Sequence, residues 1–77
     1  MATLEMWKVV PSENCFRRYK ISEQRRLFGG YDLMLEWGRI GAIVRCKMET
    51  CESIDELTRR RSKIVEKRRR HGYRRVG

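Results

Sequence analysis

Apolar and polar residues alternate along the first two thirds of the chain, which is the pattern of half-buried β-strands. Residues 4–10 form a short apolar-rich run that predicts a first strand. Residues 16–22 alternate so that only the side carrying Tyr19 and Ile21 can be buried without cost. The clearest strand is residues 31–37, in which one face carries only large apolar side chains: Tyr31, Leu33, Leu35 and Trp37.

Turn sequences separate these strands. Residues 11–14 (Pro-Ser-Glu-Asn) close the first strand, and Gly29-Gly30 is typical of a hairpin turn. Residues 38–41 (Gly-Arg-Ile-Gly) predict a connection, because two glycines three residues apart favour a bend. Residues 42–48 alternate again and predict a further strand. Short turns between successive strands imply an antiparallel meander of three to five strands, with residues 73–76 as a candidate edge strand.

The last third of the chain has the pattern of a helix. Ser53 and Glu56 form a capping box, and apolar residues recur at helical spacing up to the end signal His71-Gly72. Arg61 interrupts this apolar stripe at a position where a large apolar residue is expected. Because the helix must cover the apolar face of the sheet, we expect one α+β domain over residues 1–77, a small antiparallel meander packed against one C-terminal helix. The stripe residues are Ile54, Leu57, Ile64 and Val65.

Charge is distributed unevenly along the chain. The 77 residues contain 19 Lys+Arg against 10 Asp+Glu, a formal net charge of +9. Residues 1–37 carry 6 basic and 5 acidic side chains, whereas residues 38–77 carry 13 basic and 5 acidic ones. Such an asymmetry favours an anionic partner, although a merely solvated basic face is the alternative.

Most of the excess charge belongs to the helix and the residues after it. Cations near a helix C-terminus suit the helix dipole, but that effect accounts for two or three of them. The remaining arginines would repel one another, which predicts phosphate groups close to this surface. Glu66 is the single acid in the span of ten basic residues: Arg59, Arg60, Arg61, Lys63, Lys67, Arg68, Arg69, Arg70, Arg74 and Arg75.

The cysteines give no sign of a disulfide framework, since they are three and have no paired spacing. A zinc site formed by Cys15, Cys46, Cys51 and His71 is the alternative, because the spacing of Cys46 and Cys51 is permitted for ligands. An odd offset of five residues along a strand, however, puts those two thiols on opposite faces. We therefore interpret the cysteines as small buried apolar residues, and we expect no metal and no other cofactor.

An enzyme is not expected. A domain this small has little room for a deep pocket, and the sequence contains no plausible Ser/His/Asp or Cys/His set and no nucleotide-phosphate loop. A small-molecule substrate is not expected either. The sequence has no signal peptide and no apolar stretch approaching about 20 residues, so we expect no membrane association and a reducing, cytoplasmic location.

Residues 27–41 (LFGGYDLMLEWGRIG) resemble the signature of the WGR domain family. That signature is a glycine-containing turn, an alternating strand and the motif Trp-Gly-Arg-Ile-Gly. Asn14 followed by Arg17 and Tyr19 resembles the N-terminal motif of the family. Residues 66–67 with 72–73 resemble the end of its helix. The resemblance covers about residues 5–76, while residues 42–45 and Arg18 depart from the family pattern.

The resemblance implies a binding function. The best-known WGR domains lie within DNA-dependent poly(ADP-ribose) polymerases, where they help to recognise DNA strand breaks. There the motif tryptophan packs on the sugar of the terminal nucleotide and the motif arginine contacts DNA or a neighbouring domain. These roles would fall on Trp37 and Arg39. The chain has no room for a polymerase domain, so no ADP-ribosylating activity is implied.

The two motif residues have structural alternatives. Trp37 shares strand parity with Leu33 and could belong to the core, or it could rotate out at the strand end and stack on a sugar or base. Arg39 could pair with Glu36 or Asp32, or bind a phosphate. The residues predicted to bind nucleic acid are Trp37, Arg39, Arg60, Lys63, Lys67, Arg68, Arg70 and Arg74.

The sequence thus predicts a module that binds nucleic acid, with DNA favoured over RNA and strand ends or breaks favoured over continuous duplex. A separate effector protein is a further candidate partner. The alternatives are a protein-interaction module that docks an acidic partner, in which Trp37 is buried, and an RNA-associated basic protein.

Overall fold

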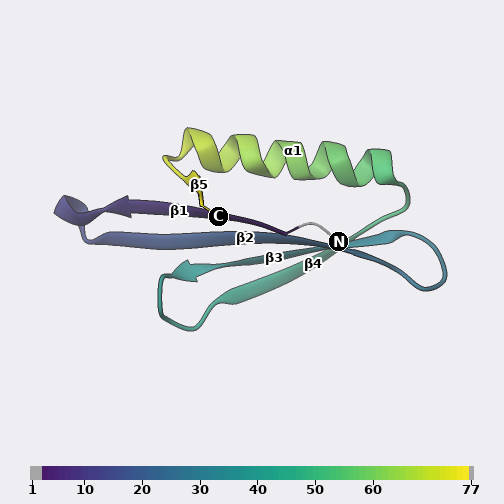
Figure 1. The fold of residues 1–77 in the computed structure, drawn as a ribbon, viewed down its shortest axis with the longest axis horizontal. Helices are drawn as coiled ribbons and strands as arrows, with labels where there is room; N and C mark the ends of the chain where they lie inside the picture. Colours follow the sequence, from purple (N-terminus) through teal and green to yellow (C-terminus); the bar gives the residue numbers. More distant parts are fainter. Residues whose placement is uncertain (1–2, 77) are drawn as a thin grey trace.

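A five-stranded antiparallel sheet with one helix on a single face makes up the structure, a computed structural model that describes residues 3–76 (Figure 1). The strand order is β4-β3-β2-β1-β5, so the first four strands form a meander and the last joins its far edge. The α+β prediction is therefore confirmed. The elements are β1 (Thr3–Val10), a 3-10 turn η1 (Pro11–Glu13), β2 (Cys15–Arg25), β3 (Tyr31–Arg39), β4 (Arg45–Cys51), α1 (Ile54–Arg70) and β5 (Arg74–Val76).

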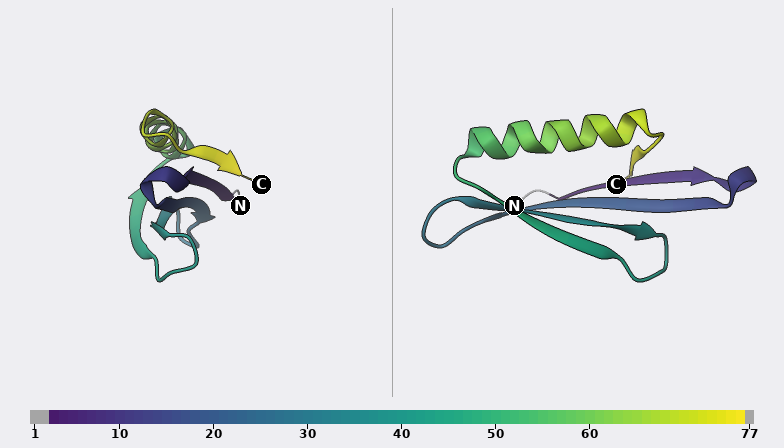
Figure 2. Two further views of the ribbon diagram at one scale, coloured as in Figure 1. Left: turned by 90° about the vertical axis from the view of Figure 1, so that its left-hand side faces the viewer. Right: turned by 180° about the vertical axis from the view of Figure 1, so that it is seen from behind.

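The molecule is elongated, with extents of 47 × 24 × 19 Å. Figure 2 shows that α1 runs along one face of the sheet and leaves the other face open. The β1–β2 hairpin extends past the C-terminal end of the helix. One end of the helix-facing side of the sheet is therefore not covered by the helix.

β1, β2 and β3 are longer than the sequence predicted, whereas β4 covers Arg45–Cys51 instead of residues 42–48. β3 continues through Gly38 to Arg39, and the backbone N–H of Ile40 donates to the carbonyl oxygen of Phe16 at 2.8 Å. The glycine pair of the motif therefore does not begin the connection. The chain turns at residues 40–44, and Ile43, which was expected within a strand, is 97% exposed.

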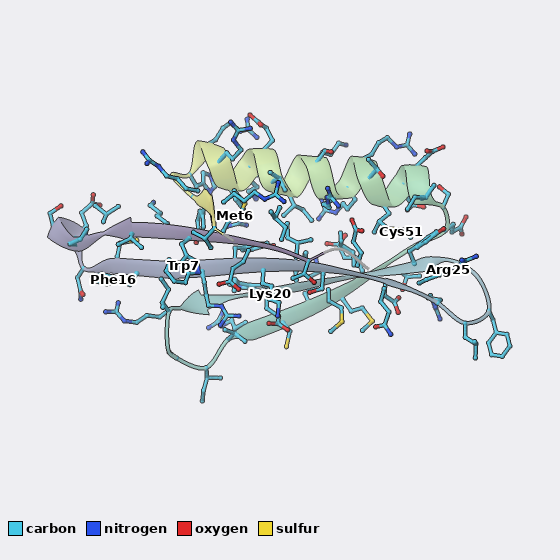
Figure 3. All side chains as sticks on the ribbon, viewed as in Figure 1. Met6, Trp7, Phe16, Lys20, Arg25 and Cys51 are labelled. Carbon is cyan, nitrogen blue, oxygen red and sulfur yellow. The ribbon has the colours of Figure 1, made fainter. Side chains whose placement is uncertain are left out.

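The core lies between the sheet and α1. Leu33 and Leu35 are buried, as their alternation predicted, while Tyr31 and Trp37 are half-buried on the same side. Figure 3 shows Met6 on the side of the sheet that faces the helix. The buried residues are Met6, Tyr19, Ile21, Leu33, Leu35, Cys51, Leu57, Ile64 and Tyr73.

The register of β4 corrects the prediction that all three cysteines are buried. Lys47 and Glu49 pair with Leu35 and Leu33, so the charged positions of β4 lie on the helix-facing side. Cys46 therefore lies on the open side and is exposed, whereas Cys51 is buried at 2% exposure. The odd offset does place the two thiols on opposite faces, as expected.

Both ends of α1 are capped. The Ser53 hydroxyl accepts a hydrogen bond from the Glu56 backbone N–H at 3.1 Å, as the capping box predicted. The Glu56 carboxylate accepts from the backbone N–H of Glu52 at 2.9 Å, one residue before the expected donor. At the other end, Gly72 has a φ of +94°, and the Tyr73 N–H reaches back to the Arg68 carbonyl at 3.0 Å. This turn directs Tyr73 into the core and β5 onto β1.

Arg61 occupies its apolar-stripe position because it has an ion partner. Its guanidinium pairs with Glu23, whose side chain is only 9% exposed on the helix-facing side of β2. The sequence had placed the end of that strand at residue 22 and so did not include Glu23. Ile54 was expected in the core as part of the apolar stripe, but it is 49% exposed.

Candidate nucleic-acid interface

Three cations lie opposite one another where the sheet extends past the helix. Lys8 of β1 pairs in register with Arg17 of β2, and Arg17 pairs with Arg39 of β3. Like charges directly opposite each other on neighbouring strands destabilise a sheet. No acidic residue interrupts this cation row. Sequence reasoning missed Lys8 and Arg17 as site candidates, because only the register of the hairpin aligns them with the motif arginine.

Arg39 holds the tip of the β1–β2 hairpin. Its two terminal guanidinium nitrogens donate to the backbone carbonyl and the side-chain oxygen of Asn14, each at 3.2 Å. The guanidinium also lies 5.3 Å from the centre of the Phe16 ring. Both hydrogen-bond acceptors are neutral, and Arg39 makes no ion pair with an acidic residue in the described chain. The positive charge is therefore held in place without being neutralised, and the other N–H groups remain available as donors.

The motif tryptophan belongs to an aromatic stack beside the cation row. Trp37 pairs in register with Tyr19, and their rings are 6.0 Å apart with an interplanar angle of 18°. Trp37 stays on the side of Leu33 and Leu35 and does not rotate out of the strand. It is half-buried and packed against the core, which agrees with the core alternative, and its stacking on a nucleotide stays a prediction.

Arg68 reaches from α1 onto this stack. Its guanidinium carbon lies 4.4 Å from the centre of the Tyr19 ring, within the range of a cation–π contact. Its Nε is buried and donates to no acceptor within residues 3–76. Burial raises the pKa of the Tyr19 phenol above its usual value, and the nearby Arg68 charge partly offsets that effect. The phenol is therefore un-ionised at neutral pH.

A groove of about 510 Å³ lies along α1 and reaches Tyr19 of the sheet. Five of the eight predicted site residues line it, and all five belong to the helix: Arg60, Lys63, Lys67, Arg68 and Arg70. Tyr19 contributes the sheet side and Glu66 is the acidic residue of the lining. The helical spacing that was read from the sequence thus gathers these cations along one flank of the groove.

One of these cations is already paired. Arg60 donates two hydrogen bonds to Glu49 of β4, at 2.7 and 3.0 Å. This bidentate pair lowers the pKa of the Glu49 carboxyl and neutralises the Arg60 charge. Lys63, Lys67 and Arg70 form no ion pair with an acidic residue in the part of the chain that the structure describes. They are therefore among the helix cations that are free to meet an anion.

Two further cations extend the basic surface onto β4. Arg45 pairs in register with Trp37, and Lys47 pairs with Leu35, so both lie on the helix-facing side of the sheet and are exposed. The sequence did not identify them, because the alternation of residues 42–48 does not say which side faces the core.

Arg74 lies apart from the other predicted residues. It sits on β5, opposite Trp7 of β1, and lines a second hollow of about 620 Å³ on the other flank of α1. Arg69 and Arg75 share that hollow, together with the ion-paired Arg61. No aromatic stack like that of Tyr19 and Trp37 accompanies these cations among residues 3–76.

The comparison with known families agrees with this geometry. The sequence profile of the WGR domain matches residues 2–77. The chain belongs to the WGR domain family. Domains of this family are generally nucleic-acid-binding modules rather than catalysts. No match was found for this WGR domain among curated proteins or among solved structures.

Residues 3–76 contain no group of three or more His, Cys, Asp or Glu side chains arranged to hold a metal ion. Over the same residues, no helix has the length and apolar character needed to cross a membrane.

Proposed function

We propose that this WGR domain binds DNA in preference to RNA, and strand ends or breaks in preference to continuous duplex, without catalysis of its own. The observation that carries the proposal is the cation row of Lys8, Arg17 and Arg39, whose strand positions are next in register to those of the stacked Tyr19 and Trp37. The cations can contact a phosphate while the neighbouring aromatic rings stack on a sugar or base of the same strand.

The cation row favours an anionic ligand on energetic grounds. Three like charges opposite one another cost stability in the free protein, and a phosphate between them would relieve that repulsion. Arg39 is the best oriented of the three, because its two hydrogen bonds to Asn14 fix the guanidinium without neutralising its charge. It would hold a terminal phosphate with its remaining donors.

The groove supplies contacts that do not depend on sequence. Lys63, Lys67 and Arg70 lie along one flank at helical spacing, which suits successive phosphates of one strand. Arg68 would act differently from these three, since its stacked guanidinium presents a buried Nε donor close to Tyr19. Arg60 would contribute little unless it leaves Glu49. Arg74 would meet only a ligand that also reaches the far flank of α1.

The preference for ends follows from what a terminus exposes. An interior nucleotide hides its base between neighbours, whereas a terminal one leaves a base face and a sugar free. The partly exposed edge of Trp37, supported by Tyr19, would cover that surface. Stacking of this kind contributes about 1–3 kcal/mol per base.

The test compares binding to nicked, blunt-ended and closed circular DNA, with RNA of the same sequence alongside. Trp37→Leu should keep an apolar side chain at this position but remove the aromatic ring, and Arg39→Gln should remove the charge. Each should reduce the preference for nicked over closed DNA by about tenfold, as expected for one lost stacking or phosphate contact. Trp7→Leu on the open side is the matched control and should leave the preference unchanged.

Thermal melting of each variant separates a binding defect from unfolding. Wild-type protein that binds closed circles as tightly as nicked DNA would contradict the end preference. Tighter binding to RNA than to DNA would contradict the choice of nucleic acid.

A further inference from the structure

The outer edge of β4 is an unpaired strand edge. β4 is the last strand on its side of the sheet, and residues 45–48 and Thr50 are all exposed. The opposite edge, β5, is only three residues long and carries Arg74 and Arg75. Proteins protect free edges by making them short or charged, because an exposed edge is a template for another strand. β5 is both short and charged with one sign, whereas β4 is seven residues long and carries charges of both signs.

The sequence of β4 is complementary to itself in one antiparallel register. Pairing two copies about Met48 places Lys47 opposite Glu49 of the second copy, and Glu49 opposite its Lys47. This register uses all seven residues of Arg45–Cys51 in both copies. Opposite charges at directly paired positions stabilise a sheet, and like charges destabilise it.

The two neighbouring registers that keep both helices on one face oppose like charges at their centres, and the one centred on residue 47 offsets this only by setting Arg45 opposite Glu49. A pairing centred on residue 47 sets Lys47 against Lys47, and one centred on residue 49 sets Glu49 against Glu49. At the centre of the favoured register, Met48 meets its own copy on the open side of the sheet, where its side chain is now 56% exposed. The favoured arrangement therefore also buries apolar surface that is left uncovered in one copy.

We propose that two copies of this chain join edge to edge through β4, in antiparallel register about Met48, to form one continuous ten-stranded sheet. Residues that pair in this register lie on the same side in both copies, so both α1 helices lie on one face of the joined sheet. Both basic grooves then face the same way. The proposal concerns the edge of the sheet and stands whether or not the domain binds DNA.

The charge pairs allow a test by complementary variants. Lys47→Glu sets carboxylate against carboxylate in a homodimer, and Glu49→Lys sets ammonium against ammonium. Each variant alone should dissociate about tenfold or more readily than wild type, because two paired positions change from attraction to repulsion. Mixed in equal amounts they should dimerise again, since every pair then joins opposite charges.

Sedimentation velocity at rising protein concentration and constant salt measures these equilibria. Circular dichroism of each variant checks folding, which matters for Glu49→Lys because it also removes the Arg60 partner. A wild-type protein that stays monomeric up to about 1 mM overturns the proposal. Its association free energy would then be weaker than about −4 kcal/mol, which corresponds to a Kd of about 1 mM. Single variants that dimerise as tightly as wild type, or a mixture that associates no better than its components, also overturn the proposal.

Cross-linking tests the register itself. In a background with Cys15→Ser and Cys46→Ser, Met48→Cys should form an intermolecular disulfide with oxidised glutathione as oxidant. Directly opposed residues have Cα atoms about 4.5–5.5 Å apart, within the disulfide range. Thr50→Cys is the matched control, exposed on the same side of the same strand but four residue steps, about 13 Å, from its copy. Equal cross-linking of the two variants, or none for Met48→Cys, would rule out this register.

Discussion

The helix-facing side and the open side of the sheet treat their charges in different ways. On the open side the charged groups find partners: Arg18 lies 3.7 Å from Glu36, Thr50 donates to Asp32 at 3.3 Å, and the Trp7 indole donates to Glu5 at 2.7 Å. Lys20 also lies on this side (Figure 3), opposite Glu5 and Glu36 in register, although it forms no ion pair within residues 3–76.

On the helix-facing side, cations outnumber carboxylates. Glu23 and Glu49 are the acidic residues at its described strand positions, and both are already paired with arginines of α1. Lys8, Arg17 and Lys47 have no carboxylate partner within residues 3–76. The difference supports our proposal that nucleic acid approaches the side that also carries the core, where packing fixes the positions of the cations.

The largest difference between the sides should appear in stability. Leu33→Ala removes a side chain with 0% exposure and should cost about 2–5 kcal/mol. Val9→Ala on the open side, where Val9 is 47% exposed, should change stability by less than about 0.5 kcal/mol. Urea denaturation measures both. Similar costs for the two variants would mean that the open side is also buried, for example by a partner.

The coupling free energies of ion pairs on the two sides should also differ, but by less than the effects of the two core and surface substitutions. A double-mutant cycle on Arg61 and Glu23 should give a coupling of about 1–2 kcal/mol, because Glu23 is nearly buried and hydrogen-bonded. The same cycle on Arg18 and Glu36 should give about 0.5 kcal/mol or less, as is usual for longer, more exposed pairs. An equal coupling on both sides would remove the distinction.

The smallest effect should be the pH dependence of the Arg60–Glu49 pair. The hydrogen bond from Arg60 lowers the pKa of the Glu49 carboxyl in the folded state. Its contribution is therefore present above the unfolded pKa and is lost as the pH falls through the lowered folded pKa. Both side chains are partly exposed, so we expect less than about 1 kcal/mol. Denaturation of wild type and Glu49→Gln from pH 7 to pH 2 should give stability curves that converge in acid; parallel curves would contradict the assignment.

Local patterns predicted the architecture but not the register between strands. The alternation of residues 31–37 identified Leu33 and Leu35 as core, and Ser53 marked the start of α1, because both signals depend on neighbours along the chain. The exposure of Cys46 could not be predicted, since alternation alone does not say which side of β4 is buried.

For the candidate site, too, the local features could be predicted from the sequence and the contacts between elements could not. The cations of the groove were predicted from the basic run in the helical segment, which is a local feature of the sequence. The alignment of Lys8 and Arg17 with Arg39 depends on strand register, and the pairing of Arg60 with Glu49 joins separate elements. Trp37 was the instructive case, because strand parity placed its side correctly, while its partial burial depends on how far the helix covers the sheet.

The central claim is that the helix-facing side is the nucleic-acid-binding side. Two variants test it with the same change in net charge: Lys63→Gln with Lys67→Gln in the groove, and Arg18→Gln with Lys20→Gln on the open side. The measurement is the slope of log K against log[salt] for nicked duplex DNA.

Each lost phosphate contact should reduce the magnitude of that slope by about 0.9, so the groove variant should flatten it by about 1.8 and bind more weakly at every salt concentration. The open-side variant should keep the wild-type slope. Equal losses in the two variants, or a larger loss in the open-side variant, would contradict the account.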